Sequence, residues 1–241
     1  MRHLLLLAVI AVSHPAHAMC SRQDIMQPNL LTRRDTRVPA DGGIVVGYAY
    51  NRGDNEVEKT RTDDPSDVLW TARDVKRKPV TLARTSLAPG LSVFRPAATT
   101  DFVVVDAAGT QVGSFTRGGK PIVIDAPLLK TVRYQTEGAT EMRWSPSTRT
   151  ILELAKAPPA EAIAVIVYIG DKPVTFTTLA DTHDKQLSLD IYDAGGHCPS
   201  AKPTGTGAVG ANSTVTFAYV DTFGRLSPQS KPVTVSRELT R

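Results

Sequence analysis

The fold class is clearest at residues 101–115, which read Asp101-Phe102-Val103-Val104-Val105-Asp106-Ala107-Ala108-Gly109-Thr110-Gln111-Val112-Gly113-Ser114-Phe115. Two short runs rich in β-branched and aromatic residues flank a small, polar centre, which is the pattern of a β-hairpin. Gly109 can adopt the positive φ that such a turn requires. The stretch therefore predicts two antiparallel strands joined by a tight turn.

Runs of the same kind recur on both sides of this hairpin, and 17 Gly and 17 Pro supply breaks between them. Alternation of apolar and polar residues, typical of half-buried strands, occurs at 79–84, 150–154 and 187–192. Residues 162–169 are almost all apolar, which indicates a central strand buried on both faces. The other expected strands lie at 44–50, 68–72, 91–94, Pro121-Ile122-Val123-Ile124, 130–136, 141–146, 174–179, 214–220 and 231–236. The chain is predicted to be all-β.

Seven short strands before Ala126-Pro127 and a second series after it fit two tandem β-sandwiches. We expect the chain to divide into residues 1–18, a signal peptide; 19–37, a polar, irregular, extended leader; 38–125, a first sandwich; and 126–241, a second sandwich.

The last part of the chain reads Phe217-Ala218-Tyr219-Val220-Asp221-Thr222-Phe223-Gly224-Arg225-Leu226-Ser227-Pro228-Gln229-Ser230-Lys231-Pro232-Val233-Thr234-Val235. This stretch resembles the closing hairpin of fibronectin type III domains, and Trp144-Ser145-Pro146 looks like an early strand of that family with its core tryptophan. The resemblance covers residues 128–236, whereas residues 38–125 look only generically immunoglobulin-like. It implies a β-sandwich and says almost nothing about activity.

The N-terminus predicts export. Arg2 precedes an apolar run from Leu4 to Val12, and Ala16-His17-Ala18 forms a small-residue cleavage site. The run is too short to span a bilayer, which requires about 20 apolar residues. We therefore expect a soluble protein of the periplasm or the extracellular space; a buried N-terminal helix is the alternative.

The cysteines are Cys20 and Cys198, and an even count in an exported chain predicts a disulfide between them. In the chain-entropy model, closing so long a loop is worth up to ~4–5 kcal/mol. Lipid anchoring through Cys20 is an alternative. It is disfavoured because Met19 and His17 occupy positions where lipoproteins usually carry a small residue and a leucine.

The net charge is +4, but basic and acidic residues alternate, as in the segment from Asp54 to Arg61. Nucleic-acid binders usually concentrate Lys and Arg on one face, so no nucleic-acid partner is expected. After the signal peptide no apolar run is long enough to be a transmembrane segment. The expected partner is an unidentified extracellular or periplasmic protein or glycan.

The sequence contains no convincing group of catalytic residues, and we therefore favour a protein without enzymatic activity. His183 lies in a polar turn, Asp181-Thr182-His183-Asp184, without a Gly-x-Ser-x-Gly motif, and we expect it to be exposed. A secreted hydrolase with carboxylate or His183 chemistry is one alternative, because a glycosidase needs two carboxylates across a cleft. Its candidate carboxylates are Asp63, Asp64, Asp67, Asp181, Asp184, Asp190 and Asp193.

A periplasmic metal-binding protein using His197 and Cys198 is the other alternative, since histidine and cysteine bind copper and zinc. The few scattered methionines argue against copper, and Asp181 and Asp184 lack the spacing of a calcium loop. We expect no metal, no cofactor and no catalytic residue.

The aromatic residues could form a sugar-binding platform, but core packing is expected because they lie in strand-like runs. They are Tyr48, Tyr50, Trp70, Tyr134 and Trp144. The long loops 52–67 and 193–213 are the expected places for partner contacts. The sequence thus favours an exported, non-enzymatic binding or structural β-sandwich protein.

Overall fold

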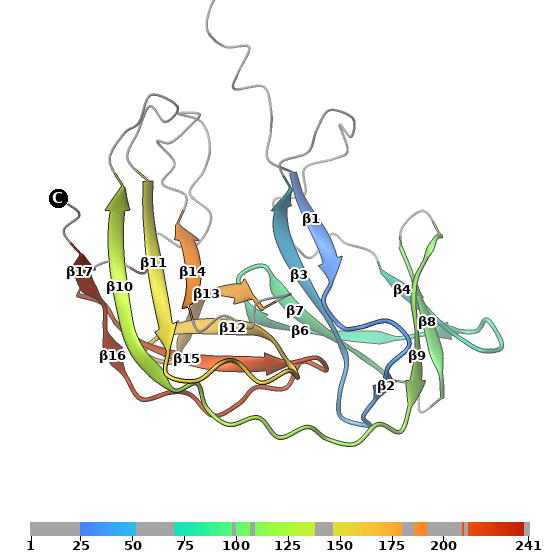
Figure 1. Cartoon of the computed structure of the whole chain (residues 1–241). Helices are drawn as coiled ribbons and strands as arrows, with labels where there is room; N and C mark the ends of the chain where they lie inside the picture. Colours follow the sequence, from blue (N-terminus) through green and yellow to red (C-terminus); the bar gives the residue numbers. More distant parts are fainter. Residues whose placement is uncertain are drawn as a thin grey trace, which may run out of the picture.

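A computed structural model of the chain describes residues 25–51, 70–97, 100–106, 109–137, 147–179, 186–191, 209 and 212–238. Within these ranges every regular element is a β-strand, which confirms the all-β prediction (Figure 1). No helix capable of crossing a membrane occurs in the described part of the chain.

The strands form four sheets. The first contains, in spatial order, β1 (Ile25–Leu30), β3 (Ile44–Asn51), β7 (Leu91–Pro96) and β6 (Leu82–Ala88). The second contains β2 (Arg37–Val38), β9 (Gln111–Arg117), β8 (Phe102–Val105), β4 (Thr71–Asp74) and β5 (Pro79–Val80). The third contains β13 (Lys172–Thr178), β12 (Ala162–Ile169), β15 (Thr214–Asp221) and β16 (Val233–Thr234). The fourth contains β14 (Gln186–Ile191), β11 (Ser147–Leu154), β10 (Leu129–Glu137) and β17 (Ser236–Glu238).

The first and second sheets enclose one apolar core. Ile44 and Val46 of β3 point into it together with Phe94 of β7, and Phe102 and Phe115 face them from the second sheet. The rings of Phe102 and Phe115 stack with centroids 5.3 Å apart, because their strands pair directly at these two residues. The N-terminal half is therefore a β-sandwich.

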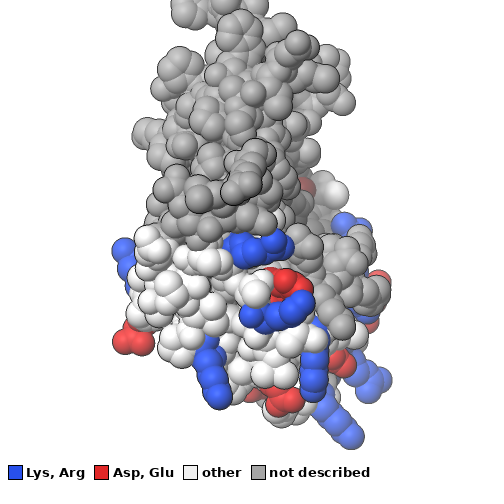
Figure 2. All heavy atoms as spheres, turned by 60° about the vertical axis from the view of Figure 1, so that its left-hand side comes forward, with Lys and Arg blue, Asp and Glu red and all other residues white. Residues whose placement is uncertain are grey.

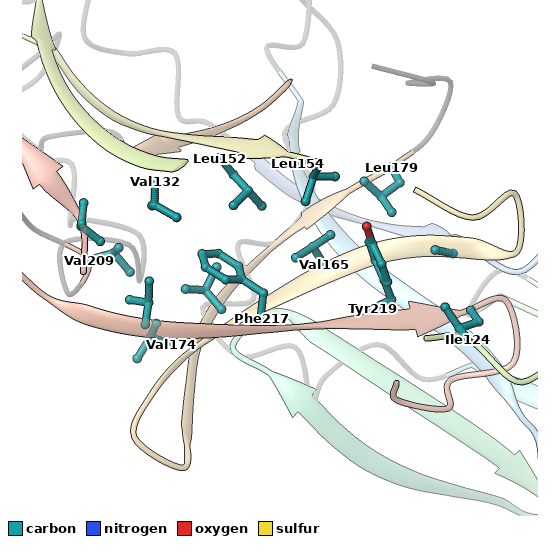
Figure 3. Packing of buried hydrophobic residues seen from close by; sticks show 14 residues of the cluster. Ile124, Val132, Leu152, Leu154, Val165, Val174, Leu179, Val209, Phe217 and Tyr219 are labelled. Carbon is teal, nitrogen blue, oxygen red and sulfur yellow. The ribbon is translucent and has the colours of Figure 1, made fainter. Parts of the chain in front are cut away.

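The third and fourth sheets enclose a second core (Figure 3). Phe217 and Tyr219 project from β15 toward Leu152 and Leu154 of β11. Val165 lies beside them on β12, with no exposed surface. The C-terminal half is thus also a β-sandwich, and the alternate residues of β15 are left to face the other way.

A third apolar core lies between the two sandwiches. The first sheet contributes Val45, Leu91 and Val93, and the third sheet contributes Ile166 and Val220. Each of these five side chains is completely buried. Because Val45 alternates with Ile44 and Val46, the first sheet buries both faces, and the third sheet does the same. The four sheets therefore form four successive layers, with β12, β13, β6 and β7 near the middle of the molecule (Figure 1).

Two strand predictions are confirmed in detail. The hairpin predicted at 101–115 is β8 and β9, which pair antiparallel, and Gly109 in its turn has a φ of +82°. The run 162–169 is β12, which lies between β13 and β15 in its sheet, and its side chains are buried on both faces.

Two other local predictions are wrong. Pro121-Ile122-Val123-Ile124, expected to close the first set of strands, pairs with no strand. Ile124 is buried and Val123 is 91 % exposed, so the segment alternates like a strand but only connects the two sandwiches. Residues 25–30, expected as irregular leader, form β1 because they pair along their whole length with β3. The boundary at residue 126 stays a prediction.

Candidate functional site

Most residues predicted to carry chemistry lie outside the described residues. These are Cys20, Cys198, His183, His197 and all the candidate carboxylates except Asp190, which is on β14. The disulfide, the hydrolase alternative and the metal alternative stay predictions. Within the described ranges, no three His, Cys, Asp or Glu residues gather closely enough to hold a metal ion.

The two long loops are also largely outside the described residues, but one end of the second is fixed. Val209 is buried in the core of the C-terminal sandwich, and its carbonyl oxygen accepts a hydrogen bond from Thr150 Oγ1 at 3.4 Å. Of the aromatic candidates, Trp70 and Tyr134 pack against the two sandwich cores, as expected.

One motif of the first loop was missed from the sequence. Arg52-Gly53-Asp54, the cell-adhesion tripeptide, immediately follows β3 and opens the loop 52–67. The tripeptide lies outside the described residues, so only its place in the chain is known.

A set of polar contacts lies where the two sandwiches meet, at the turn Asp221–Arg225, which begins at the last residue of β15. The amide of Asp221 donates to the carbonyl of Arg225 at 2.9 Å, and Gly224 donates back to the carbonyl of Asp221 at 3.0 Å. Asp221 Oδ1 accepts hydrogen bonds from the amides of Phe223 and Arg225, each at 2.8 Å. Gly224 has a φ of +77°, which a glycine adopts without strain. The aspartate and the glycine together build the turn.

This turn belongs to the C-terminal half but docks into the N-terminal sandwich. Phe223 is 6 % exposed and is a member of the N-terminal core. Its carbonyl oxygen accepts a hydrogen bond from Gly43 at 2.9 Å. Thr32 Oγ1 donates to the carbonyl of Thr222 at 2.7 Å and accepts from the amide of Val45 at 2.8 Å. The N-terminal half therefore completes its core with a side chain from the other half.

The fit around the turn is tight. A Cβ added to Gly224 would lie 2.4 Å from Val93 Cγ2, and one added to Gly42 would lie 3.0 Å from Phe223 Cβ. A side chain at position 224 would therefore overlap Val93, and one at position 42 would press on Phe223. We call the turn Asp221–Arg225, with its contacts to the N-terminal sandwich, the junction latch.

Three arginines hold the loop that faces the junction latch. Arg225 Nη2 lies 2.5 Å from Asp41 Oδ1, and Arg95 Nε donates to the carbonyl of Asp41 at 3.3 Å. Arg117 donates to the carbonyls of Pro39 and Ala40, at 2.9 and 2.7 Å. Since the Asp41 side chain is 69 % exposed, its ion pair adds only about 0.2–1 kcal/mol. The hydrogen bond from Arg225 lowers the pKa of Asp41.

Asp221 differs from Asp41 in both burial and the direction of its pKa shift. The residue is 1 % exposed, and Oδ2 is buried without a hydrogen-bond partner. Burial raises the pKa of Asp221, against the two backbone hydrogen bonds and the positive charge of Arg225, which lower it. The junction latch thus contains one buried carboxylate whose charged form is disfavoured.

Among the described residues, the outer face of the C-terminal sandwich shows simpler polar contacts. Lys130 Nζ and Glu153 Oε1 form an exposed ion pair at 2.7 Å between β10 and β11. Figure 2, in which this side of the molecule comes forward, shows basic and acidic side chains interspersed over the described surface. Charge of one sign is not concentrated there.

No protein-family model matches the chain, and no curated protein sequence matches it significantly. Among solved structures the chain is similar to one described as "Biofilm associated protein - BSP domain", with a TM-score of 0.27 and 11 % sequence identity. The match covers 89 % of this chain and 30 % of that structure, so the chain spans less than a third of its length. So low a score supports no statement about family or activity.

Proposed function

We propose that this protein is an exported, non-enzymatic binding or structural module made of two tandem immunoglobulin-like or fibronectin type III-like sandwiches. In this proposal residues 1–18 are removed as a signal peptide and Cys20 and Cys198 form a disulfide. The module acts in the periplasm or the extracellular space. Its partner is an extracellular or periplasmic protein or glycan.

The observation that carries the proposal is the junction. The side chains of Arg95, Arg117 and Asp221 form hydrogen bonds with backbone groups, and Asp41 pairs with Arg225; such contacts stiffen a scaffold. The completely buried face between the sandwiches adds about 1.5–3 kcal/mol for each large aliphatic side chain removed from water. A stiff scaffold of this kind can present loops in a fixed relation, since binding residues are often on loops held by a rigid framework.

The expected contact regions are the loops 52–67 and 193–213. The first carries both charge signs and Arg52-Gly53-Asp54, and the second is rich in glycine. Binding through the first loop should weaken with salt, because exposed charges are screened.

The proposal is tested with the exported chain and two probes, a glycan array and an isolated cell-envelope fraction. We expect saturable binding that is lost when the loop 52–67 is replaced by a four-residue turn. The variant Asp54→Glu alters only the tripeptide, so its binding shows whether the tripeptide or the rest of the loop makes the contact. Turnover of ester, glycoside or peptide substrates that disappears in His183→Ala would contradict the proposal. Stoichiometric copper or zinc lost in His197→Ala would do so as well.

A further inference from the structure

The described chain contains three turns of the same construction, and they differ mainly in burial. Each begins with an aspartate: Asp74, Asp106 and Asp221. In each turn the aspartate amide donates to the carbonyl four residues later, and its side-chain Oδ1 accepts from the amide of that same later residue. The residue three positions after each aspartate has a positive φ; these residues are Arg77, Gly109 and Gly224.

The match is closest between Asp74 and Asp221. Asp74 Oδ1 also accepts two backbone amides, from Lys76 at 2.9 Å and Lys78 at 2.7 Å. Those bonds lie at the surface, whereas Asp221 and its bond to the Phe223 amide are buried. The same local structure is therefore present once in water and once inside the junction latch.

The effect of protonating Asp221 depends on Oδ2, the carboxylate oxygen without a hydrogen-bond partner. Oδ1 accepts both backbone bonds, and Oδ2 has no partner, so a proton on Oδ2 breaks neither bond. The charged groups that act on Asp221 are Arg225, on the same turn, and Asp41, on the facing loop. Arg225 is itself paired with Asp41.

We propose that the junction latch is an acid-strengthened device, in which uptake of one proton by Asp221 tightens the docking of the turn on the N-terminal sandwich. Release of that proton loosens it. The two sandwiches are then coupled more strongly in mildly acidic surroundings than at neutral pH. This inference does not depend on what the protein binds.

The sign follows from the direction of the shift. Because burial raises the pKa of Asp221 when the turn is docked, the docked state holds the proton more tightly than the open state. Docking is therefore favoured at low pH and weakens as pH rises from the open-state pKa through the raised one. Asp41 sets the lower limit, since the pKa of Asp41 is lowered and its pair with Arg225 is lost as pH falls through that value.

The test is native-state hydrogen exchange of the full-length chain at about pH 4.5 and about pH 7.5, corrected for intrinsic rates. The amide of Gly43 donates to Phe223 across the latch, and the amide of Asp74 provides the reference in the exposed turn. We expect the ratio of protection, Gly43 over Asp74, to be larger at the lower pH. The increase should be about tenfold for each pH unit by which the pKa of Asp221 in the docked state exceeds the lower pH of the experiment.

The matched variants are Asp221→Asn and Asp74→Asn, which both keep an oxygen for the backbone bonds but have no proton to gain. Asp221→Asn should abolish the pH dependence of the ratio, and Asp74→Asn should leave it unchanged. An equal ratio at both pH values, or a dependence that survives in Asp221→Asn, overturns the proposal. If Asp221→Asn does not fold, the carboxyl-carbon NMR titration of Asp221 in the unmodified chain decides, since titration at or below 3.8 rejects the proposal.

Discussion

Replacing Phe223 with alanine removes from the N-terminal core a side chain that the C-terminal half supplies. The residue is 6 % exposed and packs in the same cluster as Phe94 and Phe102. Truncating a buried phenylalanine to alanine costs about 3–5 kcal/mol, because both transfer free energy and packing are lost. The hydrogen bonds of the turn use backbone groups and Asp221, so they remain. For a chain of this size the melting temperature should fall by roughly 6–20 °C.

The assay is equilibrium urea unfolding followed by circular dichroism, together with hydrogen exchange of the peptide spanning β8 and β9. The matched control is Leu226→Ala, three residues along the same segment but 47 % exposed, which should change stability by no more than about 0.5 kcal/mol. We expect Phe223→Ala to reduce protection in β8 and β9, although the substitution lies in the other half. A loss below about 1 kcal/mol, or a loss confined to the C-terminal sandwich, would refute the reasoning.

Three further predictions concern Gly224, Tyr219 and the two cysteines. Gly224→Ala should lower the free energy of unfolding by at least about 1–2 kcal/mol more than Gly109→Ala. Both glycines have a positive φ, but only at Gly224 would the added Cβ overlap a neighbouring side chain, that of Val93; comparing the urea midpoints of the two variants measures the difference. Burial raises the pKa of Tyr219 to about 12, so the free energy of unfolding should decrease as pH rises from 10 to about 12; alkaline titration of Tyr219→Phe should lack this loss of stability. Mass spectrometry of the exported chain should show Cys20 bonded to Cys198, and two alkylatable thiols without reductant would contradict the disulfide.

The sequence predicts elements whose signal is local. Alternation around Gly109 is sufficient for the hairpin of β8 and β9, because strand pairing and turn are adjacent in the chain. The unbroken apolar run 162–169 indicates burial on both faces, and β12 has it. Pro121-Ile122-Val123-Ile124 shows where this reasoning fails. Ile122 and Ile124 contact the sandwich cores without pairing with a strand, and Val123 is exposed.

The junction latch could not be predicted in the same way. The sequence from Asp221 to Arg225 reads as an ordinary hairpin turn, and its docking partner lies about 180 residues earlier, at Thr32 and Gly43. One signal was present: Phe223 is a large apolar residue in a turn where polar residues are usual. Likewise the apolar residues Val45 and Val93 alternate with residues of the N-terminal core, so their side chains point to the opposite face of the sheet and require another sheet to cover them. Nothing local identifies that face.

The most direct test of the account is whether the two sandwiches move as one body. Backbone 15N relaxation of the full chain gives rotational correlation times separately for residues of β7 to β9 and of β10 to β12. The buried face between the sandwiches and the junction latch predict one common correlation time, that of a particle of the whole chain's size. Two distinct, shorter correlation times would mean that the halves tumble independently, and the account of a single stiff scaffold would be contradicted.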